Sequence, residues 1–268
     1  MKNTAHNERN SLKTFYLYIV LVLIIICIAL LIKGFFIFQQ SKFDPAHEFT
    51  LAVVEQGKIK ELISFHPQVP SVESLFMQDS IPYQNLAKDY GIHTDGYIQV
   101  NSNDFSSDIT AFMWSSILHT DIWQSDLTII DKFRLMLLSK SVTSNNKSRD
   151  EISLSNPGPN TSTEITTDLT DQDISNENIT IQIINATNIS GFGQRLGRVL
   201  STMGANVVQI STAQNIQKKS TIAYYGDESY TLDRIEKMLN ITATKFHRQQ
   251  IADIVITIGT DKSNTNEF

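Results

Sequence analysis

The sequence predicts a mixed α/β protein that has one N-terminal transmembrane helix and two small folded domains. Three observations indicate this: an uncharged apolar run near the N-terminus, a long polar stretch at 141–178, and short β-type runs that alternate with helical periodicity on both sides of that stretch. The predicted order is a cytoplasmic tail at 1–14, a membrane helix at 15–38, a small α/β domain at 48–140, a flexible linker at 141–178 and a C-terminal domain at 179–262.

The apolar run at 15–32 is eighteen residues without a charge, and none of its faces is polar. A helix needs about 20 apolar residues to cross a bilayer, so the run predicts a membrane span. Lys2, Arg9 and Lys13 precede it, and the positive-inside rule therefore places the N-terminus in the cytoplasm and the rest of the chain outside. A cleaved signal peptide is the rival interpretation, but it would have a shorter apolar run followed by small residues.

The composition narrows the classes of partner. The net charge of −6 disfavours nucleic acid, whose binding requires clustered Lys and Arg side chains. Cys27 is the only cysteine and lies in the apolar run, so the exported part has neither a disulfide nor a thiolate metal site. No cofactor or metal is expected, because the histidines of the exported part show no ligand-like pairing. They are scattered at His47, His66, His93, His119 and His247.

The polar stretch at 141–178 is dominated by Ser, Thr, Asn and Asp, and its isolated Ile and Leu residues form no period. Such a segment buries too little apolar surface to offset the entropy lost on ordering. We therefore expect a flexible linker between two folded regions.

The first domain begins with two strand-like runs, Phe49–Val54 and Ile59–Phe65, around a Glu-Gln-Gly-Lys turn that predicts a hairpin. Tyr97–Val100 is a third predicted strand, and Asn103 and Ser125 are the expected N-caps of two helices. The predicted inward-facing residues are Phe105, Ile109, Phe112 and Ile117 on the first helix and Leu127, Ile130, Phe133 and Leu137 on the second, with Trp114 and Trp123 also in the core.

The C-terminal domain has the clearer pattern. Apolar residues recur at helical spacing in 192–203 and 231–239, and Gly204 is suited to end the first of these helices. The strand-like runs are 179–184, 206–210, 221–225 and 254–258. This βαββαβ order predicts a two-layer sandwich of the split-βαβ type.

The loop Asn185–Gly193, after the first of these strands, invites a dinucleotide-binding interpretation. However, Leu196 stands where the third glycine of that motif belongs, and no acidic residue ends the next strand. A structural interpretation is favoured, in which Ser190 caps the following helix and Gly191 and Gly193 permit a tight turn.

An intermediate interpretation stays open, because amides at a helix N-terminus together with Arg195 can hold an anionic or hydroxyl-rich ligand. The sequence contains no Ser-His-Asp order or nucleophile elbow, so no catalytic residue and no metal ligand is predicted. The candidate ligand-binding residues are Asn185, Thr187, Ser190, Gly191, Gly193 and Arg195.

The run ITIQIINATNISGFGQRLGRVLSTMGANVVQI resembles the C-terminal domain of LytR-type cell-envelope proteins. It shares that family's order of a strand ending in Asn and a small residue, a Ser-Gly-x-Gly turn, a helix, a glycine and an apolar strand. The runs STIAYYGD and ADIVITIGTD match the family's later strands, and Ala186 stands where the family usually has Gly. The resemblance implies a role in the cell envelope.

The first domain is similar to the catalytic domain of the LytR-CpsA-Psr family in FTLAVVEQGKIKELISFHPQVP and YGIHTDGYIQVNSNDF. That family transfers lipid-linked glycopolymers to peptidoglycan, with Arg and Asp residues for pyrophosphate and Mg²⁺. Its hairpin runs into Pro-Arg-Asp, whereas Pro67 is followed here by Gln68 and Val69. The resemblance therefore implies a degenerate, non-catalytic derivative, because a pyrophosphate leaving group would lack charge stabilisation.

Together these inferences predict a single-pass cell-membrane protein that binds or scaffolds at the cell wall without catalysis. Its expected partners are the membrane, peptidoglycan or an anionic wall polymer, and other envelope proteins, but not nucleic acid. The alternative is a diverged glycopolymer–peptidoglycan transferase. Transcriptional attenuation, which the family's historical label suggests, is disfavoured because the chain is acidic and mostly exported.

Overall fold

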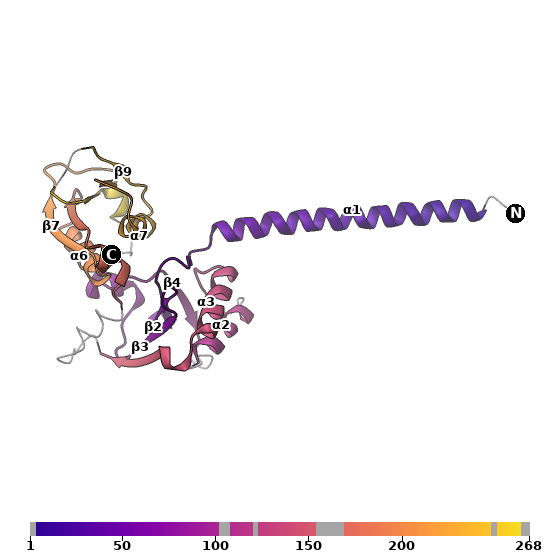
Figure 1. The fold of residues 1–268 in the computed structure, drawn as a ribbon, viewed down its shortest axis with the longest axis horizontal. Helices are drawn as coiled ribbons and strands as arrows, with labels where there is room; N and C mark the ends of the chain where they lie inside the picture. Colours follow the sequence, from indigo (N-terminus) through magenta and orange to yellow (C-terminus); the bar gives the residue numbers. More distant parts are fainter. Residues whose placement is uncertain (1–3, 102–107, 120–122, 154–168, 248–250, 264–268) are drawn as a thin grey trace.

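The computed structural model describes residues 4–101, 108–119, 123–153, 169–247 and 251–263, with two mixed sheets at one end of a long helix (Figure 1). This helix, α1 (Thr4–Gln39), contains a 25-residue span, Phe15–Gln39, that is long and apolar enough to cross a membrane. None of the most apolar part of that span is buried against the rest of the protein. The predicted mixed α/β fold with an N-terminal apolar helix is confirmed.

The strands of the first domain are β1 (Phe49–Glu55), β2 (Lys58–His66), β3 (Ser71–Met77), β4 (Gly96–Val100) and β5 (Lys147–Ile152). They form one sheet in the order β4-β1-β2-β3-β5. The first three strands are an antiparallel meander, while β4 runs parallel to β1 and β5 runs parallel to β3. The predicted hairpin is confirmed, and its turn places Gln56 and Gly57 at positive φ.

Two helices, α2 (Ile109–Leu118) and α3 (Ile129–Ser141), pack their apolar residues against one face of this sheet. The other face packs against two short helical turns, η1 (Tyr83–Asn85) and η2 (Leu86–Tyr90). A further turn, η3 (Ser144–Asn146), leads into β5. The first domain therefore has a sheet with different coverings on its two faces.

Both predicted helix caps of the first domain are corrected. The carboxylate of Asp108 accepts hydrogen bonds from the first backbone amides of α2, whereas Asn103 lies outside the described residues. The cap of α3 is Thr128, which forms a reciprocal capping box with Asp131. Ser125 lies before this box and donates its hydroxyl to a backbone carbonyl of β4 instead. The Thr-x-x-Asp spacing was the local signal for the true start of α3.

The predicted inward faces of α2 and α3 are partly wrong. Phe112 and Trp123 are buried as expected, but Trp114, Phe133 and Leu137 are each about half exposed. Phe105, a further residue of the expected face, lies outside the described residues. Apolar residues occupy two sides of α3, so periodicity alone could not tell which side faces the sheet. The buried residues of α3 are Asp131, Lys132, Leu135, Met136 and Ser139.

The range 141–178, expected to be a structureless linker, contains regular structure in its described parts. The edge strand β5 takes its backbone partners from β3, so it forms although Ile152 is its only buried residue. A short helix, α5 (Gln172–Glu177), follows with Asp171 as its N-cap, and its Ile174 packs into the C-terminal core. The C-terminal unit therefore begins before residue 179.

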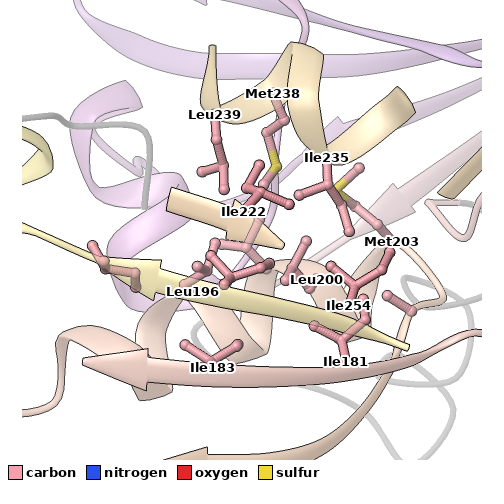
Figure 2. Packing of buried hydrophobic residues seen from close by; sticks show 14 of the residues in the cluster. Ile181, Ile183, Leu196, Leu200, Met203, Ile222, Ile235, Met238, Leu239 and Ile254 are labelled. Carbon is pink, nitrogen blue, oxygen red and sulfur yellow. The ribbon is translucent and has the colours of Figure 1, made fainter. Parts of the chain in front are cut away.

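The C-terminal strands are β6 (Thr180–Asn185), β7 (Asn206–Thr212), β8 (Thr221–Tyr224), β9 (Thr244–Lys245) and β10 (Ile254–Ile258), and a last turn is η4 (Thr260–Lys262). The helices α6 (Phe192–Thr202) and α7 (Tyr230–Leu239) share one apolar core with this sheet, which confirms the two-layer sandwich (Figure 2). The sheet order is β7-β6-β10-β8-β9. The split-βαβ expectation is wrong, because β6 and β7 are hydrogen-bonded neighbours and no strand lies between them.

Candidate functional site

The predicted binding loop between β6 and α6 is held by its own hydrogen bonds. The side-chain oxygen of Asn185 accepts from the backbone amide and the hydroxyl of Thr187, at 3.0 and 2.7 Å. The amide nitrogen of Asn185 donates to the carbonyl of Ile189 at 2.9 Å. Both side chains are buried, so they shape the loop and present little polar surface to a ligand.

The glycines of this loop serve the backbone and the packing. Gly191 is the N-cap residue of α6 at φ +75°, a conformation that favours glycine, so the predicted cap at Ser190 is corrected. A Cβ on Gly193 would lie 3.2 Å from the side chain of Ile210 on β7. These positions therefore let α6 start in a left-handed turn and approach the sheet closely.

Arg195 is the one charged group among the candidate residues, and it lies in the first turn of α6. Its guanidinium stacks over the ring of Phe192 with 5.0 Å to the ring centroid, and its side chain is half-buried. The structure thus brings the six candidate residues together at the start of α6. Among these six residues, Arg195 alone carries a charge.

A second site, which sequence reasoning missed, is an open cleft of about 1530 Å³ where the end of α1 and both domains meet. The first domain contributes the segment before β1, the segment before β4 and the segment before α3. The C-terminal domain contributes α7. The charged residues that line the cleft are Lys42, Asp44, Asp95, Asp126, Arg134, Arg234 and Lys237.

The most deeply buried of the ion pairs described in the cleft joins Arg234 of α7 to Asp95 of the first domain. The two guanidinium nitrogens lie 2.8 and 2.9 Å from the two carboxylate oxygens, and both residues are almost completely buried. Burial by itself would raise the pKa of Asp95, but the charge of Arg234 and the hydrogen bond from His93 hold that pKa far below its usual range. Asp95 is therefore ionised at neutral pH and locked to Arg234.

Other contacts extend this junction. The Nε2 atom of His47 lies 2.7 Å from a carboxylate oxygen of Asp233, and its ring stacks on Tyr230. Lys237 donates to Asp44 at 2.9 Å. Together these contacts place one face of α7 against the first domain.

The described cations of the cleft are already engaged. Lys42 donates to Asp126 at 2.6 Å, while Arg134 donates to a backbone carbonyl and stacks over Phe38 with 5.1 Å to the ring centroid. Among the described residues, no group of three or more His, Cys, Asp or Glu side chains is arranged to hold a metal ion. Gln68 and Val69, where the resembling enzymes have Arg and Asp, follow β2 outside the cleft lining, and Val69 is exposed. The cleft can therefore join the domains, but its described cations are not free to hold a pyrophosphate.

No local sequence signal marks the Asp95–Arg234 pair, because the two residues are 139 positions apart. Arg234 lies beside Ile235 in a helix whose apolar face is plain from the sequence, and its polar face looks like an ordinary solvated surface. Such a pair becomes visible only when the two domains are placed together.

Comparison with known proteins finds a family match for the C-terminal region. Residues 178–261 match the family model described as LytR cell envelope-related transcriptional attenuator, which covers the sandwich from β6 to β10. No curated protein matches the chain. The chain therefore carries a LytR-type C-terminal domain, while the first domain's similarity to the LytR-CpsA-Psr catalytic domain stays a prediction.

One solved structure with some likeness is a fragment of Lmo1026 from Listeria monocytogenes, described as a candidate transcriptional factor. It is 11% identical in sequence, the match covers 40% of this chain and 80% of that one, and the TM-score is 0.26. A likeness this weak constrains neither fold nor function.

Proposed function

We propose that this protein is a single-pass membrane protein of the cell envelope, with its N-terminus in the cytoplasm and both domains outside. Its role is to bind or scaffold at the cell wall without catalysis. The observation that carries this proposal is the presence of a LytR-type C-terminal domain on the same chain as the membrane-length helix α1. The cell-envelope association of that domain and the basic residues before the apolar run both support export.

The proposed ligand is peptidoglycan or an anionic wall polymer, and the proposed contact is the start of α6. The amides of a helix N-terminus attract anions, and Arg195 adds a positive charge within one turn of it. Other envelope proteins are proposed as further partners.

The test is sedimentation of the detergent-solubilised full chain with isolated cell walls. Arg195→Glu should weaken binding severalfold while the unfolding curve is unchanged, because Arg195 lies off the buried face of α6. Lys245→Glu, which makes the same charge change on the edge strand β9, is the matched control and should bind normally. Equal binding by all three proteins would remove the α6 site, and absence of wall binding by the unaltered chain would contradict the wall-binding role.

A transferase is the second candidate, and the observation that favours it is the cleft beside the membrane end of α1 with its basic side chains. The test is incubation of the full chain with a polyprenyl-pyrophosphate-linked sugar and Mg²⁺. We expect no turnover, because the described cations of the cleft already contact other groups of the protein and Gln68 and Val69 replace the expected charged residues. Mg²⁺-dependent release of the sugar would instead establish the enzyme.

A further inference from the structure

The outward faces of α2 and α3 are apolar. α2 contains no charged residue, and its exposed side carries Trp114 and Leu118. Along α3, Ile129, Phe133 and Leu137 recur every four residues and are 54%, 46% and 47% exposed. These five residues are called the outer apolar face below. Single exposed apolar side chains are common on proteins, but a contiguous group on neighbouring helices marks an interaction surface.

The two helices lie side by side, so their outer residues form one surface. Ser139 of α3 donates to the hydroxyl of Thr110 at 3.1 Å, and Lys132 of α3 donates to the carbonyl of Ser116 at 3.3 Å. These contacts connect both ends of α2 to α3. They also place Lys132 and Ser139 on the buried side, so polar groups lie inside while large apolar groups lie outside.

The outer apolar face is adjacent to the membrane end of α1. The guanidinium of Arg134 stacks over Phe38 in the last turn of α1, and Asp131 accepts hydrogen bonds from Ser41 and from the backbone amide of Phe43. α3 is thus attached to the segment where α1 ends. Figure 1 shows α2 and α3 on the right-hand side of the first sheet, the side on which α1 extends away towards the N-terminus. A bilayer that surrounds α1 would therefore meet these two helices before any strand of the first sheet.

We propose that the outer apolar face rests on the extracytoplasmic surface of the same membrane that α1 crosses. This inference depends on the membrane anchoring proposed above. Tryptophan and phenylalanine favour the level of the lipid headgroups, and helices with an apolar face lie in that plane. Lys140, an exposed residue in the last turn of α3, is placed to reach lipid phosphates. The first domain is thereby held against the bilayer, while the C-terminal domain, which lies beyond the C-terminal end of α1, projects from the membrane (Figure 1).

The test uses fluorescent labels on single cysteines of the full chain, reconstituted in vesicles of brominated phosphatidylcholine at low protein density. Cys27, the only native cysteine, lies exposed in α1 and reports whether the anchor is in lipid. In a Cys27→Ser background, Leu137→Cys reports on the outer apolar face. Val208→Cys is the matched control, because Val208 is 48% exposed but lies on β7, at the end of the molecule opposite α1 (Figure 1).

We expect the label at position 137 to lose most of its emission in brominated vesicles relative to unbrominated ones, and the label at 208 to lose almost none. An unquenched label at 137 together with a quenched label at 27 would overturn the inference while leaving the anchor intact. A blue-shifted but unquenched label at 137 would mean that a second copy of the chain covers the face, which also overturns it. An unquenched label at 27 would overturn both the anchor and the inference that depends on it.

Discussion

The two helical layers of this protein differ in where their apolar side chains point. In the C-terminal domain, Leu196, Leu200 and Ile235 are completely or almost completely buried (Figure 2). The outer sides of α6 and α7 are polar. In the first domain, Asp131 and Lys132 are buried while Phe133 is half exposed. The comparison teaches that apolar periodicity identifies a face but not the medium that the face meets.

The polar faces of the two layers also have different roles. The outer face of α7 docks on the first domain through Arg234 and Lys237. The inner face of α3 uses Asp131 to hold the segment that leads from α1. Charge therefore joins parts of the chain in both domains. The apolar residues of both layers pack against their sheets, but the first domain also keeps an apolar face that the described residues leave exposed.

The largest expected effect comes from placing a charge on each apolar face in turn. Leu196→Asp buries a carboxylate in the core of α6 and should cost several kcal/mol, enough to unfold the C-terminal domain. Leu137→Asp, at a half-exposed position, should cost less than about 1 kcal/mol in detergent solution. Amide hydrogen exchange measures both effects separately for each domain. If both variants behaved alike, the contrast between the two layers would be wrong.

The next largest effect is expected at the junction between the domains. Arg234→Met leaves Asp95 buried without its partner, and breaking such a pair typically costs about 3–5 kcal/mol. Lys237→Ala removes a half-exposed ion pair of the same helix and should cost less than about 1 kcal/mol. Urea unfolding of the full chain in detergent gives both values.

The pH dependence of this junction provides a further check. Because the pKa of Asp95 is lower in the folded than in the unfolded protein, its contribution is complete at neutral pH and falls as the solution becomes more acidic than the ordinary aspartate pKa. The penalty of Arg234→Met should shrink over the same range. A penalty that is independent of pH would show that the pair does not hold the domains together.

A smaller effect is expected from Asp131, the acidic group on the inner side of α3. Its burial raises the pKa, but hydrogen bonds from Ser41, from the backbone of Phe43 and from Thr128 outweigh burial and lower it. The stability that ionised Asp131 contributes is therefore present above the ordinary aspartate pKa and lost as the pH falls through the folded pKa. Asp131→Asn should destabilise the first domain by about 1–3 kcal/mol at pH 7.

The difference between Asp131→Asn and the unaltered protein should become smaller below about pH 4, the ordinary aspartate range. Denaturant unfolding at pH 7 and at about pH 2, well below the ordinary aspartate range, followed by the fluorescence of buried Trp123, measures it. A constant difference would contradict the assignment of a charged Asp131 at the start of α3.

Much of the C-terminal domain could be predicted because local patterns and burial agree there. The stripe of Leu196, Val199, Leu200 and Met203 is apolar, continuous and buried against the sheet. By contrast, β5 is an exposed edge strand that forms through backbone pairing with β3. Its sequence shows no apolar periodicity, so the strand could not be predicted from the sequence.

The two candidate sites also differ in whether the local sequence could predict them. The start of α6 was recognisable from its glycines and Asn185, because that geometry is local. The Asp95–Arg234 pair was not, because it depends on how two separate domains meet. The neighbouring order of β6 and β7 was also not predicted, since the βαββαβ pattern is compatible with more than one sheet order.

The central claim, that α1 anchors two exported domains, is tested most directly by a topology reporter fused after Phe268. A reporter that is active only outside the cytoplasm should be active in this fusion, and the same reporter fused after Lys13, before the apolar run, should be inactive. The mature protein should retain its N-terminal apolar run by protein sequencing. Cytoplasmic activity of the Phe268 fusion, or a mature N-terminus beyond Ile32, would contradict the account.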